Sequence, residues 1–173
     1  MEYLDVYDEN KNYIGKFERN YVHANALWHN TVHCWLYDKE GNIYFQIRSD
    51  ENKLYTTASG HVMAGESIKE AFGREIKEEI GISVEYENAV PINIYIYKMD
   101  KQKKDGTIFR DRAFSNVYVY KYDGKIEDFQ FDKNEINGLI KANAKSVYSV
   151  LTGEKQIMPA FWIKCENGKN IEK

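Results

Sequence analysis

Three glutamates near the middle of the chain, Glu75, Glu78 and Glu79, have the residue type and the spacing to bind a metal ion. An α-helix turns by about 100° per residue, so the three carboxylates would share one arc roughly 100° wide. Like charges at such spacings cost an isolated helix about 0.2–0.5 kcal/mol per pair. A divalent cation in front of the arc would relieve this repulsion, and Mg²⁺ suits the site because it prefers oxygen ligands. The alternative is an ordinary solvated helix face.

The element that must position these carboxylates is a helix over roughly residues 68–80. Ser67 and Glu70 have the spacing of a capping box, which predicts the start of the helix. Gly81 suits the position that ends a helix, because glycine adopts the left-handed backbone without a steric penalty. The apolar stripe that would face the core consists of Ile68, Phe72, Ile76 and Ile80.

Residues 60–82 surround this helix with a spaced pattern of glycine, glutamate and arginine. Gly60 is followed after five residues by Glu66, and after seven more by the run Arg74-Glu75-Ile76-Lys77-Glu78-Glu79-Ile80-Gly81-Ile82. The stretch matches every specified position of the Nudix signature, G-x5-E-x7-R-E-U-x-E-E-x-G-U. The chain therefore resembles the Nudix hydrolases, and residues 60–82 correspond to the Nudix box.

The resemblance implies catalytic roles for residues of the motif. Glu78 and Glu79 would be ligands of the divalent cation, Mg²⁺ or else Mn²⁺, and Glu75 would be a further ligand or the general base. Gly60 would let the loop backbone approach the metal. The reaction implied is divalent-metal-dependent hydrolysis of a diphosphate linkage in a nucleoside diphosphate derivative or a related organic pyrophosphate, a small-molecule substrate.

The resemblance also implies a structural ion pair between Glu66 and Arg74, which would tie the loop before the helix to the helix itself. A Nudix-like module that binds nucleotides without turnover is an alternative. Such modules often lose glutamates of the motif, and this chain keeps all of them.

Residues 3–85 resemble one Nudix branch in particular, isopentenyl-diphosphate isomerase and its hydrolase relatives. In the isomerases three histidines help to bind a metal, and their counterparts here are His23, His29 and His61. The resemblance therefore raises a second metal site as an open alternative to three ordinary histidines.

Two departures favour a hydrolase over an isomerase. Ser59 stands where the isomerases have a catalytic cysteine, and a hydroxyl is a far weaker proton donor than a thiol. The segment Arg110-Asp111-Arg112-Ala113-Phe114 has alanine or aspartate where the isomerases have a Glu-x-Glu pair. The isomerase reaction remains the alternative activity.

Substrate contacts are expected from basic residues outside the motif, because Lys and Arg suit phosphate oxygens. The polar segment 98–112 is predicted to be a long loop, and an ordinary solvated loop is the alternative to a substrate contact. The candidate substrate-binding residues are Arg48, Lys103, Lys104 and Arg110.

The whole chain, residues 1–173, is predicted to form one α+β domain. The resemblance implies the Nudix α/β/α sandwich, with a mixed sheet, a central helix and C-terminal helices. Residues 134–151 have helical spacing, with a break near residues 141–143. The predicted strands cover residues 4–7, 13–17, 32–37, 43–48, 92–98 and 114–122.

Composition excludes several other classes of protein. The chain has 24 Lys and Arg against 27 Asp and Glu, a net charge of −3, which argues against a dedicated nucleic-acid binder. It has no apolar run of the roughly 18 residues that a membrane span needs. Cys34 and Cys165 lie outside any C-x-x-C pattern, which favours the reducing cytoplasm. A homodimer is compatible with the sequence.

Overall fold

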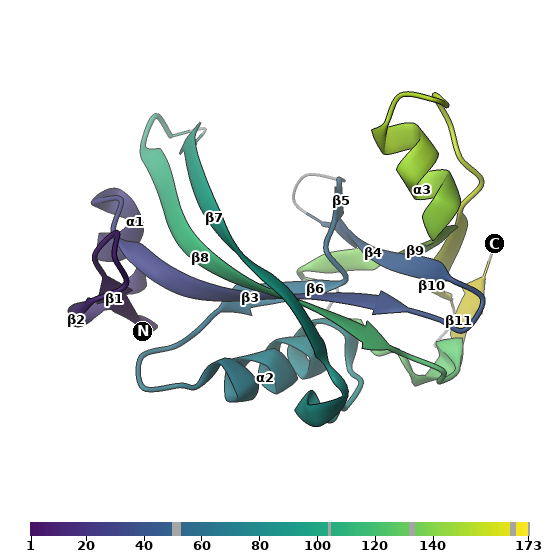
Figure 1. The fold of residues 1–173 in the computed structure, drawn as a ribbon, viewed down its shortest axis with the longest axis horizontal. Coiled ribbons are helices and arrows are strands. Elements are labelled where there is room, and N and C mark those ends of the chain that lie inside the picture. The colour runs from purple at the N-terminus through teal and green to yellow at the C-terminus, as the bar shows by residue number, and fades with distance from the viewer. Residues whose placement is uncertain (50–52, 104, 132–133, 167–168, 173) are drawn as a thin grey trace.

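The computed structural model describes residues 1–49, 53–103, 105–131, 134–166 and 169–172. One mixed sheet dominates the fold, with helices at its margins and across one face (Figure 1). The elements, in chain order, are β1 (Tyr3–Tyr7), β2 (Tyr13–Glu18), α1 (Arg19–Ala24), β3 (Trp28–Tyr37), β4 (Asn42–Arg48), β5 (Leu54–Tyr55), β6 (Ala58–His61), α2 (Ile68–Ile80), η1 (Tyr86–Asn88), β7 (Val90–Gln102), β8 (Ile108–Lys121), η2 (Ile126–Asp128), β9 (Ile136–Asn143), α3 (Ala144–Leu151), β10 (Phe161–Glu166) and β11 (Lys169–Glu172).

Strand β3 organises the sheet because it pairs with several neighbours. It runs parallel to β8 from the His29–Ala113 pair to the Tyr37–Lys121 pair. It is antiparallel to β6, whereas its pairing with β4 is limited to one pair of residues at the end of the strand. Strand β4 instead continues beside β9 and β5. The sheet therefore forks between β6 and β4, and this fork positions the candidate site.

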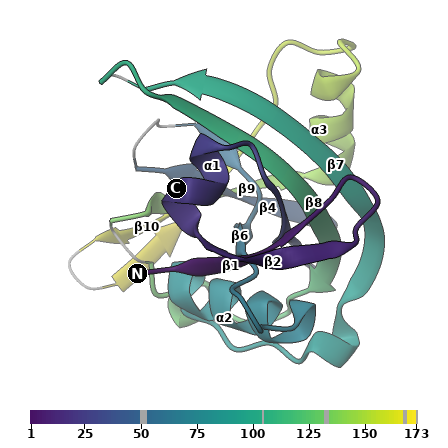
Figure 2. The ribbon, with the colours of Figure 1, turned by 90° about the vertical axis from the view of Figure 1, so that its left-hand side faces the viewer.

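Helix α2 confirms the prediction for its part of the sequence. It spans Ile68–Ile80, begins with the Ser67–Glu70 capping box and ends at Gly81, whose φ of 77° is left-handed. Its apolar stripe packs against β3, so that the helix covers one face of the sheet beside the fork (Figure 2). The main buried cluster includes Cys34, Leu36, Phe72, Ile76, Ile80, Tyr118 and Leu139.

Both predicted hairpins contain strands, but only the first pairs as expected. Strands β1 and β2 pair antiparallel along their length. Strands β3 and β4 diverge after the Tyr37–Ile43 pair, because β6 takes the place of β4 beside β3.

The prediction of a long loop over residues 98–112 is wrong. Strand β7 continues to Gln102, and β8 begins at Ile108. A short turn joins them, in which Gly106 has a φ of 85°. The outer part of this hairpin is exposed, so it lacks the alternation of apolar and polar residues that marks a half-buried strand.

The helical prediction for residues 134–151 is correct only in its second half. Residues 136–143 form β9 between β4 and β10, and the helix α3 begins at Ala144, after a cap in which the Asn143 side chain accepts a hydrogen bond from Lys145 N (3.1 Å). Ile136, Leu139 and Ile140 stand at the i, i+3 and i+4 spacing of an amphipathic helix, so the sequence of this strand has the periodicity of a helix. A single C-terminal helix, followed by β10 and β11, therefore replaces the expected helices among the described residues.

None of the helices in the described ranges has both the length and the apolar character needed to cross a membrane.

Candidate active site

The carboxylate of Glu79 lies at the fork of the sheet, where it touches both branches. Glu79 is only 2% exposed. Its Oε2 accepts hydrogen bonds from Ser59 N on β6 (2.9 Å) and Gln46 Nε2 on β4 (3.1 Å). Burial raises the pKa of Glu79 to about 8, because the anion loses its hydration. Fixed donors therefore orient this carboxylate, while its surroundings disfavour its negative charge.

The carboxylate of Glu75 lies directly against the backbone of Gly60. A Cβ atom at residue 60 would be 2.0 Å from Glu75 Cδ, so no residue with a side chain fits there without a shift of the carboxylate. Burial raises the pKa of Glu75 to about 7, although Arg74 opposes this shift. The absence of a side chain at Gly60 therefore lets β6 and the Glu75 side chain approach each other.

Arg74 connects the helix to the loop that precedes it. Its Nε and Nη2 contact the two oxygens of Glu66 at 2.7 and 2.9 Å, and Nη2 also donates to the His61 carbonyl at 2.8 Å. Its Nη1 contacts Glu75 Oε1 at 2.7 Å and Glu78 Oε2 at 3.0 Å. The side chain of Glu78 is 58% exposed. We call Glu75, Glu78 and Glu79 the helix carboxylates. The Arg74 guanidinium thus fixes the loop and contacts two of them, Glu75 and Glu78.

Glu135 adds a fourth carboxylate that sequence reasoning missed. It precedes β9, and its charge contributes to the raised pKa values of Glu75 and Glu79. Its backbone carbonyl accepts a hydrogen bond from Ser49 N (2.9 Å), just beyond the end of β4. The pairing of β4 with β9 brings it to the site, and no local sequence pattern signals that pairing.

A second group of titratable side chains, the histidine cluster, consists of His23, His29 and His61. One ring nitrogen from each lies within 4.8 Å of the others, and His23 Nε2 is 3.1 Å from His61 Nε2. Helix α1, strand β3 and strand β6 supply one histidine each. Burial lowers the pKa of His23 and of His61, so the metal-binding neutral form is favoured.

The surroundings of the histidine cluster resemble those of metal ligands. The Nδ1 atoms of His23 and His29 lie 3.1 Å from the carbonyls of Arg110 and Leu27, which leaves the Nε2 atoms to face the interior of the cluster. His29 Nε2 lies 3.3 Å from Asp111 Oδ1. Both atoms are buried and have no hydrogen-bond partner in the described part of the chain, apart from this mutual contact. Asp111 therefore offers an oxygen beside the three imidazoles.

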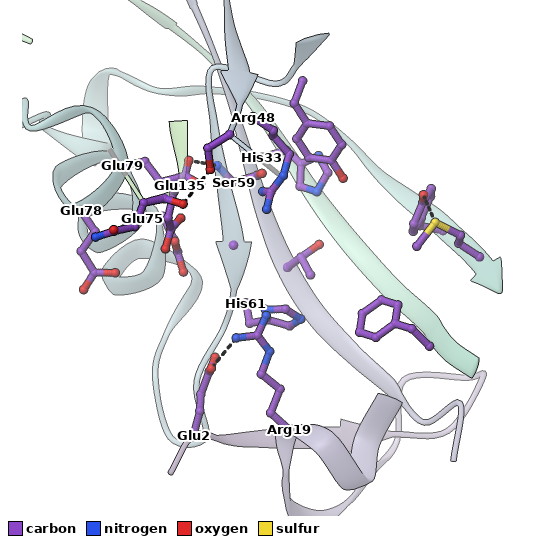
Figure 3. Close-up of a pocket in the computed structure, with 18 of the residues that line it drawn as sticks. Glu2, Arg19, His33, Arg48, Ser59, His61, Glu75, Glu78, Glu79 and Glu135 are labelled. Atoms are coloured by element: carbon purple, nitrogen blue, oxygen red, sulfur yellow. Dashed lines mark hydrogen bonds and ion pairs between the residues drawn. The ribbon is translucent and has the colours of Figure 1, made fainter. Parts of the chain in front are cut away.

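The helix carboxylates and His61 line the same pocket, which has a volume of about 950 Å³. Figure 3 shows the carboxylates and Glu135 on one side, and His61 and Arg19 toward the lower end. The aromatic side chains of the wall are Tyr55, Tyr97 and Phe109. The pocket is therefore large enough for a small organic diphosphate, and the histidine cluster reaches it through His61.

The basic residues predicted to contact substrate have different outcomes. Arg48 and Lys103 line the pocket, and the Arg48 guanidinium lies 5.8 Å from the centre of the Tyr55 ring. Arg110 is not among the lining residues, because its Nη1 donates to the Ala24 carbonyl at 2.9 Å. Lys104 lies outside the described residues. Basic lining residues that sequence reasoning did not single out are Arg19, Lys53 and Lys101.

Comparisons with known proteins agree with this geometry. The chain matches the NUDIX domain over residues 27–145. It is 34% identical over 148 residues to an uncharacterized Nudix hydrolase of Clostridium acetobutylicum, a match that covers 81% of this chain and 69% of that protein. It is 28% identical over 129 residues to isopentenyl-diphosphate Delta-isomerase of Serratia proteamaculans, covering 72% and 68% of the two chains.

The fold has a counterpart among solved structures as well. The crystal structure of DR0079 from Deinococcus radiodurans has a TM-score of 0.62 and 20% sequence identity, and the match covers 91% of this chain and 93% of that one. This likeness concerns the fold, a mixed α+β sheet with a few helices. Because the family match spans more than half of the sequence, the chain belongs to the Nudix hydrolase family.

Proposed function

We propose that this protein is a divalent-metal-dependent pyrophosphohydrolase that cleaves a diphosphate linkage in a nucleoside diphosphate derivative or a related organic pyrophosphate. The observation that carries the proposal is the convergence of Glu75 and Glu79, two carboxylates with raised pKa values, on the backbone of β6, where Glu75 lies against Gly60 and Glu79 accepts from Ser59 N. Such a pair is costly without a cation and fits the oxygen preference of Mg²⁺.

The residues fit a metal of this kind. Glu75, Glu78 and Glu79 would hold Mg²⁺, or Mn²⁺ in its place, and the Gly60 backbone leaves room for the Glu75 carboxylate. The bound ion would neutralise charge on the diphosphate oxygens and activate water for attack on phosphorus.

The protein's own groups position this chemistry. Gln46 and Ser59 N fix the direction of the Glu79 carboxylate, and Arg74 fixes Glu75. Glu75 also lines the pocket, where its carboxylate is placed to accept the proton of the attacking water. Glu75 is therefore either a ligand or the general base, and Glu135 is a second candidate base at the same pocket.

Substrate binding is assigned to the basic side chains of the pocket. Arg48 at the end of β4 and Lys103 at the tip of the β7–β8 hairpin both line it, and guanidinium and ammonium groups bind phosphate oxygens. The same wall carries the aromatic rings that would cover the organic part of the substrate.

We infer a second metal site at the histidine cluster. Three imidazoles and the Asp111 carboxylate form a donor set suited to a transition metal such as Zn²⁺. Apart from their mutual contact, the buried His29 Nε2 and Asp111 Oδ1 atoms have no hydrogen-bond partner among the described residues. This site differs in ligand chemistry from the helix carboxylates, so the two would select different ions.

The isomerase alternative has less support from the site. Ser59 supplies a backbone N–H to Glu79, and its side chain is a hydroxyl where the isomerases have a thiol. Asp111 faces His29 rather than a position opposite Ser59. The residues present therefore favour a hydrolase over an isomerase.

We further propose a cytoplasmic protein that acts on small molecules, forms a homodimer and has no dedicated role in nucleic-acid binding. The net charge of −3 supports the last point, and the scattered cysteines support a reducing compartment.

Hydrolysis of a panel of nucleoside diphosphate sugars, dinucleoside polyphosphates and oxidised nucleotides tests the activity. The products are separated by chromatography, because cleavage of the diphosphate linkage leaves the phosphates on the products rather than as free inorganic phosphate. We expect turnover with Mg²⁺ or Mn²⁺, none after chelation, and loss in Glu79→Gln. Glu40→Gln, which alters an exposed glutamate in a turn, is the matched control and should behave like wild type. Conversion of isopentenyl diphosphate to dimethylallyl diphosphate without hydrolysis of any panel compound would refute the proposal.

A further inference from the structure

The fork of the sheet is crossed by a short segment, residues 56–57, which joins β5 to β6 and which we call the crossing segment. Strand β5 pairs with β4, whereas β6 pairs with β3, so the crossing segment passes from one branch of the fork to the other (Figure 1). Thr57 is fully buried there. Because a buried hydroxyl is costly without hydrogen-bond partners, its contacts indicate what this residue does for the fold.

The Thr57 hydroxyl is inserted into the ladder between β3 and β4. Leu36 N donates to Thr57 Oγ1 at 2.9 Å, and the hydroxyl donates to the Tyr44 carbonyl. Two residues along the same ladder, Asp38 N donates directly to the Asn42 carbonyl at 3.0 Å. By the alternation of an antiparallel pair, the Leu36 N–H and the Tyr44 carbonyl would form the next direct bond. Thr57 therefore takes the place of one backbone hydrogen bond and holds the two strands at a wider spacing.

The opening beyond this point receives the Glu79 carboxylate. Its Oε2 accepts one hydrogen bond from each branch of the fork, from Ser59 N and from Gln46 Nε2. Figure 3 shows Ser59 beside Glu79. Ser59 follows Thr57 by two residues on one branch, and Gln46 follows Tyr44 by two residues on the other. The separation of the two donors therefore depends on the contact that Thr57 makes between the branches.

The side chain of Gln46 depends on the same contact. It is fully buried, and its Oε1 has no hydrogen-bond partner in the described part of the chain. The Gln46 backbone N donates a long hydrogen bond, 3.4 Å, to the Thr56 carbonyl of the crossing segment. The place of the amide beside Glu79 is therefore set by the backbone of β4 and by the segment that crosses the fork.

We propose that Thr57 is a positioning residue for the Glu79 carboxylate. Its hydroxyl sets the spacing of the fork and so places Ser59 N and Gln46 Nε2 around that carboxylate. Without the hydroxyl, the two backbone groups that it joins either lose a partner or bond to each other, and in both cases the donors move. The consequence for metal binding rests on the proposed function, because a carboxylate held by two fixed donors offers an ion a single orientation.

Amide hydrogen exchange of the metal-free protein, followed by NMR, tests the geometry independently of activity. Thr57→Val keeps the shape of the side chain and removes the hydroxyl. The Ser59 N–H should then exchange faster and the Gln46 side-chain amide resonance should shift, while the amides of the β7–β8 hairpin keep their wild-type rates. Thr56→Val is the matched control, because the buried Thr56 hydroxyl has no hydrogen-bond partner among the described residues, and it should leave both signals as in wild type. Wild-type Ser59 exchange in Thr57→Val would overturn the proposal.

Titration with Mn²⁺ and the hydrolysis assay test the consequence, at a temperature where circular dichroism shows every variant folded. Thr57→Val should bind Mn²⁺ about 10-fold more weakly and lose kcat/KM to a similar extent, as for other partners that orient a metal ligand. Thr57→Ser keeps the hydroxyl and should restore both values. A role in packing alone predicts the reverse order, because valine keeps the volume that serine loses, and that order would overturn the proposal. If wild type takes up no ion, the proposed function fails, and the exchange experiment still decides the role of Thr57.

Discussion

The two clusters of titratable side chains near the pocket differ in ligand chemistry and in construction. The helix carboxylates all come from α2, and burial raises the pKa values of Glu75 and Glu79. The histidine cluster draws one residue from each of three elements, and burial lowers the pKa values of His23 and His61. In both clusters, burial favours the neutral form of the side chain.

The comparison shows how one pocket can offer two ligand chemistries. Carboxylate oxygens suit a hard ion that also binds phosphate, whereas imidazoles suit a transition metal. The carboxylates sit on a helix with a defined start and end, while the histidines depend on the packing of α1, β3 and β6. Changes to one cluster should therefore leave the chemistry of the other largely intact.

The largest expected effect is on hydrolysis. Glu75→Gln should lower kcat/KM for Mg²⁺-dependent hydrolysis of the diphosphate linkage by at least about 100-fold, because it removes a ligand or the general base. His23→Gln should leave this rate close to that of wild type, because imidazoles are not required by Mg²⁺. Comparable losses in the two variants would show that the clusters act as one site. Circular dichroism should show both variants folded.

The next effect concerns the histidine cluster. Wild type should bind Co²⁺ with a visible absorption band typical of nitrogen ligands, and His61→Ala should lose it. His33→Ala is the matched control, since His33 also lines the pocket but lies outside the cluster, and it should keep the band. A band that survives His61→Ala but disappears in Glu79→Gln would assign the transition metal to the carboxylates.

A smaller effect is expected from the glycine of β6. Gly60→Ala introduces a Cβ that would lie 2.0 Å from Glu75 Cδ, so the carboxylate must move. We expect kcat/KM to fall by about 10–100-fold, as for other changes that misplace a metal ligand. Gly73→Ala, on α2 with no atom within 4 Å of the added Cβ, is the control and should retain activity. Unchanged activity in Gly60→Ala would contradict the close approach.

The smallest effect is on stability at low pH. Burial lowers the pKa of His33 to about 4 from its ordinary value of 6.5. Between these values the unfolded chain binds a proton that the folded protein does not, so the free energy of unfolding should decrease as the pH falls from about 6.5 to 4. Urea denaturation across this range should show a weaker decrease in His33→Gln. Identical pH profiles would exclude a lowered pKa for the half-buried His33.

The sequence was most informative where structure is local. The capping box and Gly81 define α2, because a helix start and end depend on residues within a few positions of each other. The spacing of the helix carboxylates follows from that helix. Their direction toward Gly60 depends on packing between α2 and β6, which the family resemblance indicated and the residues alone did not.

The rest of the site depends on contacts between distant segments. Glu135 reaches the carboxylates because β4 pairs with β9, and Asp111 meets His29 because β8 runs beside β3. Residues 98–112 and 136–143 were misread for related reasons. The first is an exposed hairpin without alternation, and the second is a largely buried strand whose apolar residues have the spacing of a helix.

Calorimetric titration of the metal-free protein with Mn²⁺ or Mg²⁺ tests the central claim most directly. The account predicts saturable uptake at neutral pH, retained in His23→Gln and lost or strongly weakened in Glu79→Gln. Absence of uptake by wild type, or equal uptake by Glu79→Gln, would show that the helix carboxylates do not form the site of the divalent ion.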